Sequence, residues 1–281
     1  MKKLLITLII CISFSSIITA QGWVKNKGEG FFKLSETGLQ SSKLLGPDGS
    51  ESTIRTTSIF TTNVYAEYGL SKKLTGIINL PFFVRSSLSE VRYNQSGKVE
   101  PKDAINSFGD VDIALKYGII TNKPTVLSAT ILFGIPSGVT AGGEGKILQT
   151  GDGEFNQLIR FDVSHSFYPK PFYVSAYSGF NNRSKGFSDE VRYGFDIAFT
   201  PKNWLLALHI NGISSLKNGS VTSVNNGIFS NNLEFIYPTL EIGYSFSKKF
   251  GATALAGYPL TGKNVLKAPS FSGVIFYKIL K

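Results

Sequence analysis

Five times along this chain, two runs of alternating apolar and polar residues meet at a very short turn that contains lysine or proline. The five turns lie at 71–73, 122–124, 168–171, 201–203 and 247–249. Long, polar, glycine-rich connections separate the hairpins, at 41–56, 86–108, 137–155, 182–189, 216–232 and 261–269. Short turns on one side and long loops on the other are typical of an up-and-down β-barrel in a bacterial outer membrane. The pattern predicts an all-β, antiparallel, membrane-spanning barrel.

The alternation predicts about twelve strands, at 30–40, 57–70, 74–85, 109–121, 125–136, 156–167, 172–181, 190–200, 204–215, 233–246, 250–260 and 270–279. In the strand at 109–121, Ile113 and Leu115 share one face, whereas Asp112 and Lys116 share the other. An apolar face opposite a charged face, with a period of two, indicates a strand between lipid and an aqueous interior. An even number of strands places both termini at the periplasmic side, with the short turns.

Aromatic residues favour the barrel over a soluble β-sandwich, whose strands would also alternate. They gather close to the short turns: Tyr68, Tyr117, Phe167, Tyr168, Phe172, Phe199, Trp204, Tyr244, Phe246 and Phe250. Aromatic rings at one level around a barrel form a girdle at the membrane interface. The aromatic residues of a sandwich core would not collect beside the turns.

The first twenty residues have the pattern of a secretory signal peptide. Lys2 and Lys3 precede an apolar stretch at 4–18, and the small residue Ala20 marks the expected cleavage site. We therefore expect a signal peptide at 1–20 and an outer-membrane barrel at 21–281. Cys11 is the chain's one cysteine, and the bulky Ile10 before it argues against a lipoprotein signal. The mature chain is then expected to lack disulfides and thiolate metal sites.

The charge of the chain also fits a membrane location. The formal net charge is +10, and many lysines lie in the short turns, where they would meet anionic lipid headgroups. The expected partners are outer-membrane lipid and lipopolysaccharide, and the sequence gives no oligomeric state. Because no basic cluster is interleaved with aromatic residues, nucleic-acid binding is not expected.

The two histidines give little support to catalysis. His165 shares a phase with Ile159, Phe161 and Val163, which predicts an interfacial position on the lipid-facing side. His209 falls on the inward phase with Asn211, where a hydrogen-bonded lumen histidine is favoured over a metal ligand, because no second histidine lies at ligand spacing. The glycine-rich loops do not join a strand to a helix, as a phosphate-binding loop must. We expect no catalytic residue, metal or cofactor.

The candidate site is a set of polar side chains on the inward phase of the strands. The lumen-lining candidates are Glu67, Arg85, Asp110, Asp112, Lys116, Arg160, Asp162, Arg192, Asp196, His209 and Glu241, and Lys33 shares their phase. Charges inside a partly dry lumen must pair, because isolated burial costs several kcal/mol. The set therefore predicts a salt-bridge lattice that fills the barrel. The same lattice could define a narrow polar constriction that selects solutes.

Two neighbouring stretches carry a family resemblance. Phe108-Gly109-Asp110-Val111-Asp112-Ile113-Ala114-Leu115-Lys116-Tyr117 resembles the signature strand of the family named for the MetA pathway of phenol degradation. The segment that ends in Ile135-Pro136-Ser137-Gly138 is similar to the part of the family that follows. The resemblance implies a passive uptake barrel without catalytic residues. Unlike most such barrels, the chain does not end in the aromatic residue that the barrel-insertion machinery recognises, because Tyr277 is followed by Lys278-Ile279-Leu280-Lys281.

Together these observations predict a barrel that lets small molecules, hydrophobic or aromatic ones in particular, cross the outer membrane passively. The loops at 86–108 and 137–155 would form its outer gate. The alternative is a closed barrel with a structural or surface-interaction role and no transport. A barrel enzyme ranks third, for the histidine reasons above.

Overall fold

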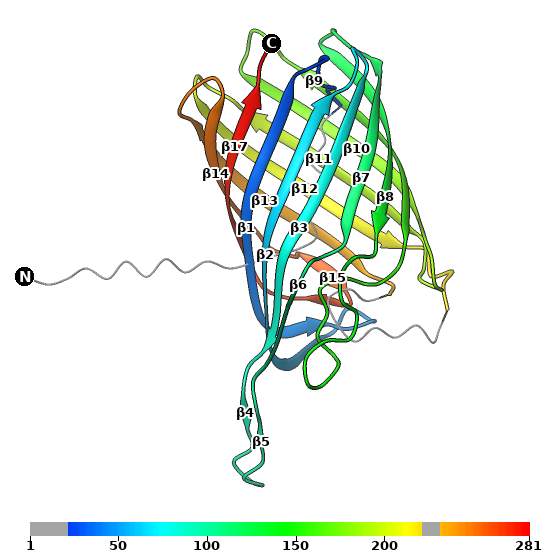
Figure 1. The fold of residues 1–281 in the computed structure, drawn as a ribbon, viewed down its shortest axis with the longest axis vertical. Coiled ribbons are helices and arrows are strands. Elements are labelled where there is room, and N and C mark those ends of the chain that lie inside the picture. Colours follow the sequence, from blue (N-terminus) through cyan, green and yellow to red (C-terminus); the bar gives the residue numbers. More distant parts are fainter. Residues whose placement is uncertain (1–21, 221–230) are drawn as a thin grey trace, which may run out of the picture.

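The computed structural model describes residues 22–220 and 231–281; the expected signal peptide at 1–20 lies outside the described residues, as does most of the loop expected at 216–232. Within the described ranges, twelve strands close into one antiparallel barrel (Figure 1). They are β1 (Gly30–Leu45), β2 (Glu51–Gly69), β3 (Leu74–Leu88), β7 (Val111–Ile120), β8 (Thr125–Ile135), β9 (Asn156–Ser166), β10 (Phe172–Arg183), β11 (Glu190–Phe199), β12 (Trp204–Ser215), β13 (Glu234–Ser245), β14 (Phe250–Gly257) and β17 (Ser270–Ile279). None of the described residues forms a helix long and apolar enough to span a membrane.

Each barrel strand pairs with the next barrel strand along the chain, and the pairing of β1 with β17 closes the barrel. The predicted twelve-stranded, up-and-down architecture is confirmed. The first three strands are longer than expected at the loop end. There β1 ends at Leu45 instead of residue 40, and β2 begins at Glu51 instead of residue 57. The chain's C-terminus lies at the short-turn end, at the top of Figure 1.

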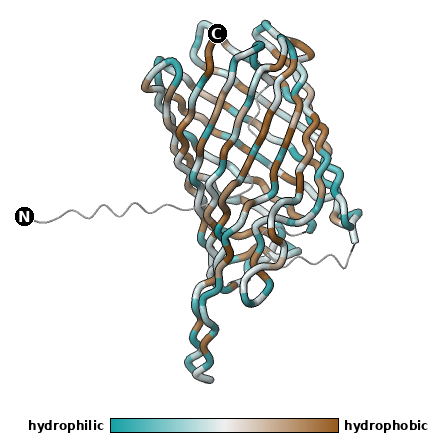
Figure 2. Tube along the Cα trace, in the orientation of Figure 1, coloured by the Kyte–Doolittle hydropathy of each residue, from teal (hydrophilic) through white to brown (hydrophobic). Residues whose placement is uncertain are grey.

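The two faces of the wall differ as the alternation predicts. On β7 the outward Ile113, Leu115 and Tyr117 are exposed, whereas the inward Ala114 and Lys116 are buried. Apolar residues recur along the strands of the wall, and polar residues mark the turns and loops (Figure 2). A closed barrel pairs every strand edge, so that an apolar exterior can face lipid without unpaired backbone groups.

The aromatic girdle lies beside the short turns. Trp204 and Tyr244 are partly exposed neighbours, with ring centroids 4.9 Å apart, and Phe246 and Phe250 extend the row. Tyr168 is 88% exposed at the tip of its turn. These rings mark the expected membrane interface at the short-turn end.

A β-bulge in β3 overturns one predicted lumen residue. Leu80 pairs with Val64 and Phe83 pairs with Thr62, so two residues of β3, Pro81 and Phe82, stand against one residue of β2. The extra residue reverses the phase of the strand beyond it. Val84 is therefore buried on the inner side, whereas Arg85 is exposed on the outer side, where it donates a hydrogen bond to Asn106. The prediction that Arg85 lines the lumen is wrong.

The long loops divide into one that projects and two that cover the barrel. The segment 86–108 forms a ribbon through β4 (Val91–Arg92), β5 (Val99–Glu100) and β6 (Asp103–Ser107), and it extends away from the loop end (Figure 1). It is therefore not the expected cover of the mouth. In contrast, the segment 137–155 has a buried part that includes Leu148, and the last loop contributes β15 (Thr261–Lys263) and β16 (Val265–Leu266), of which β16 is buried against β1.

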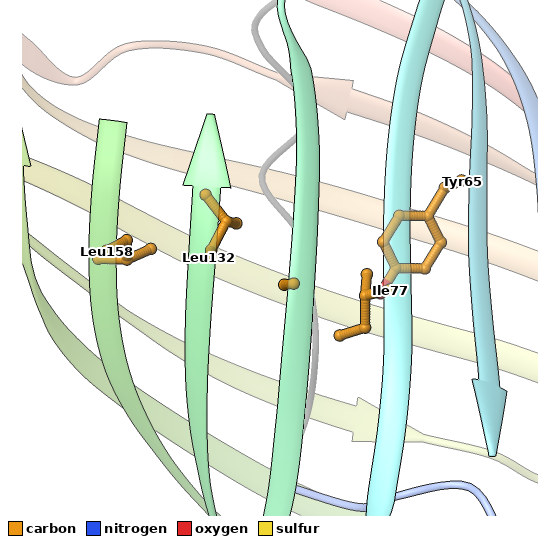
Figure 3. Packing of buried hydrophobic residues seen from close by; sticks show 5 residues of the cluster. Tyr65, Ile77, Leu132 and Leu158 are labelled. Carbon is orange, nitrogen blue, oxygen red and sulfur yellow. The ribbon is translucent and has the colours of Figure 1, made fainter. Parts of the chain in front are cut away.

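The apolar part of the interior forms three clusters. One crosses the inner wall from β2 to β9 and contains Tyr65, Ile77, Ala114, Leu132 and Leu158, four of which are labelled in Figure 3. The other two lie at the loop end, where the last loop packs against the strands: Leu39, Ile59, Val84, Leu266 and Ala268 in one, and Leu45, Phe235, Tyr237 and Val265 in the other. These two clusters make the loop end apolar beside β1, β2, β3 and β13, and the space between the clusters holds the site.

Candidate functional site

A cavity of about 340 Å³ lies inside the barrel and extends from its middle toward the loop end. Its apolar lining includes Ile59, Val84, Leu132 and Phe235, from the three interior clusters. Its charged lining is Lys33, Asp110, Asp112, Asp152, Arg160, Arg183, Glu190, Arg192, His209 and Glu241. A concave site with apolar walls and a few convergent polar groups is the usual form of a small-molecule site.

The structure places the lumen candidates in three positions. Asp110, Asp112, Arg160, Arg192, His209 and Glu241 line the cavity. Glu67, Lys116, Asp162 and Asp196 are buried on the same inner face without lining it. Arg85 lies outside, as described above. Lys33 also lines the cavity, and its ammonium lies over the rings of Phe31 and Tyr65.

Arg160 on β9 is a buried cation of the cavity wall. Its Nε donates a hydrogen bond of 2.8 Å to Oδ1 of Asp162, and both side chains are buried. Its guanidinium lies 3.8 Å from the ring centroid of Tyr177, whose hydroxyl donates to Asn211. An ion pair in this environment needs both members, because removal of one leaves an uncompensated buried charge.

His209 connects three neighbouring strands. Its Nδ1 lies 2.7 Å from Oδ1 of Asp196 on β11, and its Nε2 lies 2.9 Å from Oε2 of Glu241 on β13. This arrangement is the hydrogen-bonded lumen histidine that the sequence predicts. Among the described residues, no group of three or more histidines, cysteines or carboxylates, this one included, is arranged so that it could hold a metal ion. His165, on the outward phase of β9, contacts Thr125 Oγ1 at 2.7 Å and the ring of Phe167.

A second ion-pair network lies at the loop end of the cavity, and the sequence did not reveal it. Arg183 donates to Asp152 (2.9 Å), Glu154 (2.7 Å) and Glu190 (2.7 Å). Glu190 shares the phase of Arg192, so strict alternation could have found it. Asp152 and Glu154 belong to the segment 137–155, where no alternation exists, so their position depends on how the loop folds inward.

Asp110 ties the same loop to the start of β7. Its two carboxylate oxygens accept hydrogen bonds from the backbone N–H groups of Gly138 (2.8 Å) and Asp152 (2.9 Å). Asp110 lies in the loop before the membrane-spanning part of β7. Burial raises the pKa of Asp110 to about 7, and the negative charge of Asp152 acts in the same direction. The carboxyl is therefore a titratable anchor for the loop that covers the mouth.

At the opposite, short-turn end, two of the buried lumen candidates, Glu67 and Lys116, contact the segment that precedes β1. Glu67 accepts a hydrogen bond from the Tyr65 hydroxyl (2.6 Å) and forms an ion pair with Lys25 (3.3 Å). Lys116 donates to the backbone carbonyl of Trp23 at 3.5 Å. Residues 22–25 therefore lie within the barrel. Sequence reasoning missed this, because the segment has neither alternation nor a motif.

No known protein family and no curated protein matches the sequence. Among solved structures, the fold is similar to that of the COG4313 outer membrane channel from Pseudomonas putida F1, with a TM-score of 0.64 and 13% identity, over 91% of this chain and 97% of that chain. The chain has the fold of an outer-membrane β-barrel. The NanC porin (TM-score 0.52, 9% identity, 88% of this chain and 100% of that chain) and the KdgM porin (0.50, 7%, 89% and 99%) share this architecture.

Proposed function

We propose that this protein is an outer-membrane channel through which small molecules cross passively. The observation that carries the proposal is the cavity of about 340 Å³ inside a closed barrel, lined at once by apolar side chains and by charged groups. A barrel of twelve strands is intermediate between small barrels filled by side chains and large ones with an open aqueous channel. A narrow, selective passage suits this size better than a wide pore.

The solute class that fits best is a small hydrophobic or aromatic molecule. The two apolar clusters at the loop end, which include Ile59, Val84 and Phe235, would receive the apolar part of a solute, and the charged wall would orient any polar group. The resemblance of residues 108–117 to the MetA-pathway family and the fold of a channel support this proposal. Outer-membrane lipid, lipopolysaccharide and the barrel-insertion machinery are the further partners that such a location requires.

Single-channel conductance of the refolded protein in planar bilayers tests the proposal. We expect a small, steady current that aromatic solutes block. Arg192 lines the cavity and its side chain is 31% exposed, so Arg192→Gln should change conductance or ion selectivity without loss of fold. Arg85→Gln is a matched control, because it removes the same charge from the outer side of the wall. Absence of current and of solute flux from a correctly folded barrel would overturn the proposal.

A closed barrel without transport is the second candidate, and the occupied interior favours it. The ion pairs of Arg160 and Arg183 and the inserted residues 22–25 occupy part of the lumen. Liposome-swelling assays with small uncharged solutes separate the two functions, since a hydrophobic-solute channel admits them even where it carries little ion current. Impermeable liposomes that contain folded barrels would favour the closed scaffold.

A further inference from the structure

The segment 22–29 enters the barrel at the short-turn end and lies across the lumen. It reverses direction in a β-turn at 26–29, in which the N–H of Glu29 donates to the carbonyl of Asn26 (2.9 Å). Gly28 has a φ of 83°, which glycine adopts without strain at the third position of such a turn. The Glu29 carboxylate also accepts hydrogen bonds from the backbone and side chain of Asn26. The turn aims the preceding residues back into the barrel instead of into the periplasm.

Successive residues of the segment contact successive strands. The N–H of Lys25 donates to Thr75 Oγ1 on β3 (2.9 Å), and its ammonium pairs with Glu67 on β2 (3.3 Å). The ring of Trp23 lies edge-on to Tyr173 on β10, with centroids 5.4 Å apart. The N–H of Gly22 donates to Ser164 Oγ on β9 at 2.8 Å, in a buried position. The segment thus runs from β2 and β3 across to β9 and β10.

The inner wall carries glycines where the segment lies closest. A Cβ added at Gly69 would lie 1.9 Å from the carbonyl oxygen of Asn26, and one added at Gly118 would lie 3.0 Å from Val24. Any larger residue at Gly69 would collide with the backbone of the segment. The wall is therefore shaped to receive residues 22–26.

The segment lies on the short-turn side of the cavity, against β2, β3, β7, β9 and β10. None of the described residues 22–29 lines the cavity, and neither do Glu67, Lys116 and Ser164, which contact the segment. A solute that enters from the loop end would therefore reach the cavity but meet residues 22–26 before the periplasmic opening.

We propose that residues 22–26 form a displaceable stopper, which closes the short-turn end of the lumen and withdraws about the turn at 26–29 when a solute passes. This inference rests on the proposed channel function. The stopper is held by individually modest contacts, and the Lys25 side chain of its ion pair is 30% exposed. The wall beneath it is polar, since it contains Thr75, Lys116 and Ser164. Water can replace the hydrogen bonds that these groups lose, so withdrawal leaves a wettable passage.

A reversible disulfide tests the inference. A Cβ at Gly22 would lie 3.1 Å from Ser164 Oγ, which is close enough for a disulfide between Gly22→Cys and Ser164→Cys. Residues 21–281 contain no native cysteine, so the refolded double variant has one possible bridge. We expect the oxidised form to carry no current and the reduced form to conduct as the wild type does. Each single variant serves as a control. Equal current in the oxidised and reduced forms would overturn the stopper.

Thiol labelling of Ser164→Cys tests the same inference without a current. Ser164 is 1% exposed beneath the segment, so a polar thiol reagent reaches it only when the stopper withdraws. We expect slow labelling of this variant, fast labelling after deletion of residues 22–26, and labelling roughly fivefold faster with Glu67→Gln, as loss of a partly exposed ion pair implies. Labelling equally fast with and without the segment would overturn the stopper.

The two measurements also distinguish failure of the stopper from failure of the channel. If labelling depends on the segment but neither the wild type nor the deletion variant passes ions or solutes, the proposed function fails and the segment is a structural plug. If the wild type conducts and the disulfide has no effect, the channel stands and the stopper fails.

Discussion

At the scale of single residues, burial decides which lumen charges are structural. Arg160 and Asp162 are both buried, whereas the Arg192 side chain is 31% exposed beside Glu190. From the sequence alone, neutralising Arg160 and neutralising Arg192 would be expected to have the same effect on stability. The structure separates them, because Glu190 keeps its ion pair with Arg183 (2.7 Å) when Arg192 is removed, whereas removal of Arg160 takes away the ion-pair partner of the buried Asp162.

We therefore expect Arg160→Ala to lower the free energy of unfolding by about 3–5 kcal/mol, the usual cost of breaking a buried pair. Arg192→Ala should cost less than about 1 kcal/mol, as for a partly exposed pair. Urea unfolding in detergent, followed by the heat-dependent shift in gel mobility, measures both. Equal stability of the two variants would show that the Arg160 pair is hydrated and contributes as a surface pair does.

The raised pKa of Asp110 predicts that the free energy of unfolding depends on pH. Because burial raises its pKa in the folded state to about 7, the folded protein keeps the proton over a range in which the unfolded chain, with an ordinary value of 3.8, has lost it. The contribution of Asp110 to stability is then greatest at low pH and falls as the pH rises from about 4 to about 7, by up to about 4 kcal/mol. Asp110→Asn should flatten the profile of unfolding free energy against pH. A wild-type profile that rises across this range would contradict the assignment.

Glu36 is a charged residue of β1 that is not among the predicted lumen-lining residues. Its neighbours Lys33, Ser35 and Thr37 line the cavity or share that phase, so Glu36 points outward, where it accepts a hydrogen bond of 2.5 Å from Thr62. A carboxylate on the lipid-facing wall is unfavourable, so Glu36→Leu should raise the free energy of unfolding by about 1 kcal/mol. Glu36→Gln, which keeps the hydrogen bond, is the control. A strong loss of stability in Glu36→Leu would indicate a partner for the carboxylate within the membrane.

At the scale of elements, the bulge in β3 shows that alternation alone cannot predict which residues face the lumen beyond a bulge. Alternation identified both faces of β11, and of β7 up to Gly118, because no bulge interrupts the phase within those stretches. In β3, one extra residue at Pro81–Phe82 places every later side chain on the face opposite to the one that strict alternation predicts. The sequence shows only that a proline is present there. Proline within strands is concentrated at edges and bulges, so its presence allowed a bulge without specifying the direction of the residues beyond it.

Insertion of one alanine between Phe82 and Phe83 should keep the bulge and shift the rest of β3 by one residue, so that Phe83 would pair with Thr61 instead of Thr62. Val84 and Ser86, now buried, would then face outward, and Arg85 would face the apolar cluster of Leu39 and Ile59. We expect a loss of more than about 4 kcal/mol, or no folded barrel at all. Phe82→Ala keeps the register and should fold normally, as judged by gel mobility. A stable insertion variant would show that the loop end tolerates a slipped register.

The loops and the inserted segment could not be predicted for a different reason. The alternation of apolar and polar residues shows which side chains of a strand share a face. The segments 137–155 and 22–29 have no such alternation, and their burial depends on contacts between residues far apart in the chain. The hydrogen bond from Gly22 to Ser164 and those from Gly138 and Asp152 to Asp110 are of this kind. The barrel was therefore predictable, whereas the contents of its mouth and of its periplasmic end were not.

At the scale of the whole molecule, the charge inside differs in sign from the charge of the chain. The formal net charge is +10. On the inner face and its loops, among the described residues, the carboxylates are Glu67, Asp110, Asp112, Asp152, Glu154, Asp162, Glu190, Asp196 and Glu241. The cations there are Lys25, Lys33, Lys116, Arg160, Arg183, Arg192 and Lys278, with His209 held between two carboxylates. The lysines of the turns account for much of the positive excess and lie outside the lumen.

We therefore expect a cation-selective current at pH 8, because an excess of carboxylates along a narrow lumen attracts cations and repels anions. The reversal potential across a potassium chloride gradient measures this selectivity. Asp112→Asn should weaken the preference for cations and Arg192→Gln should strengthen it, since both side chains line the cavity. Arg85→Gln, on the outer side of the wall, should leave the reversal potential unchanged. An anion-selective current would mean that the turn lysines at the periplasmic entrance, and not the lumen carboxylates, control permeation.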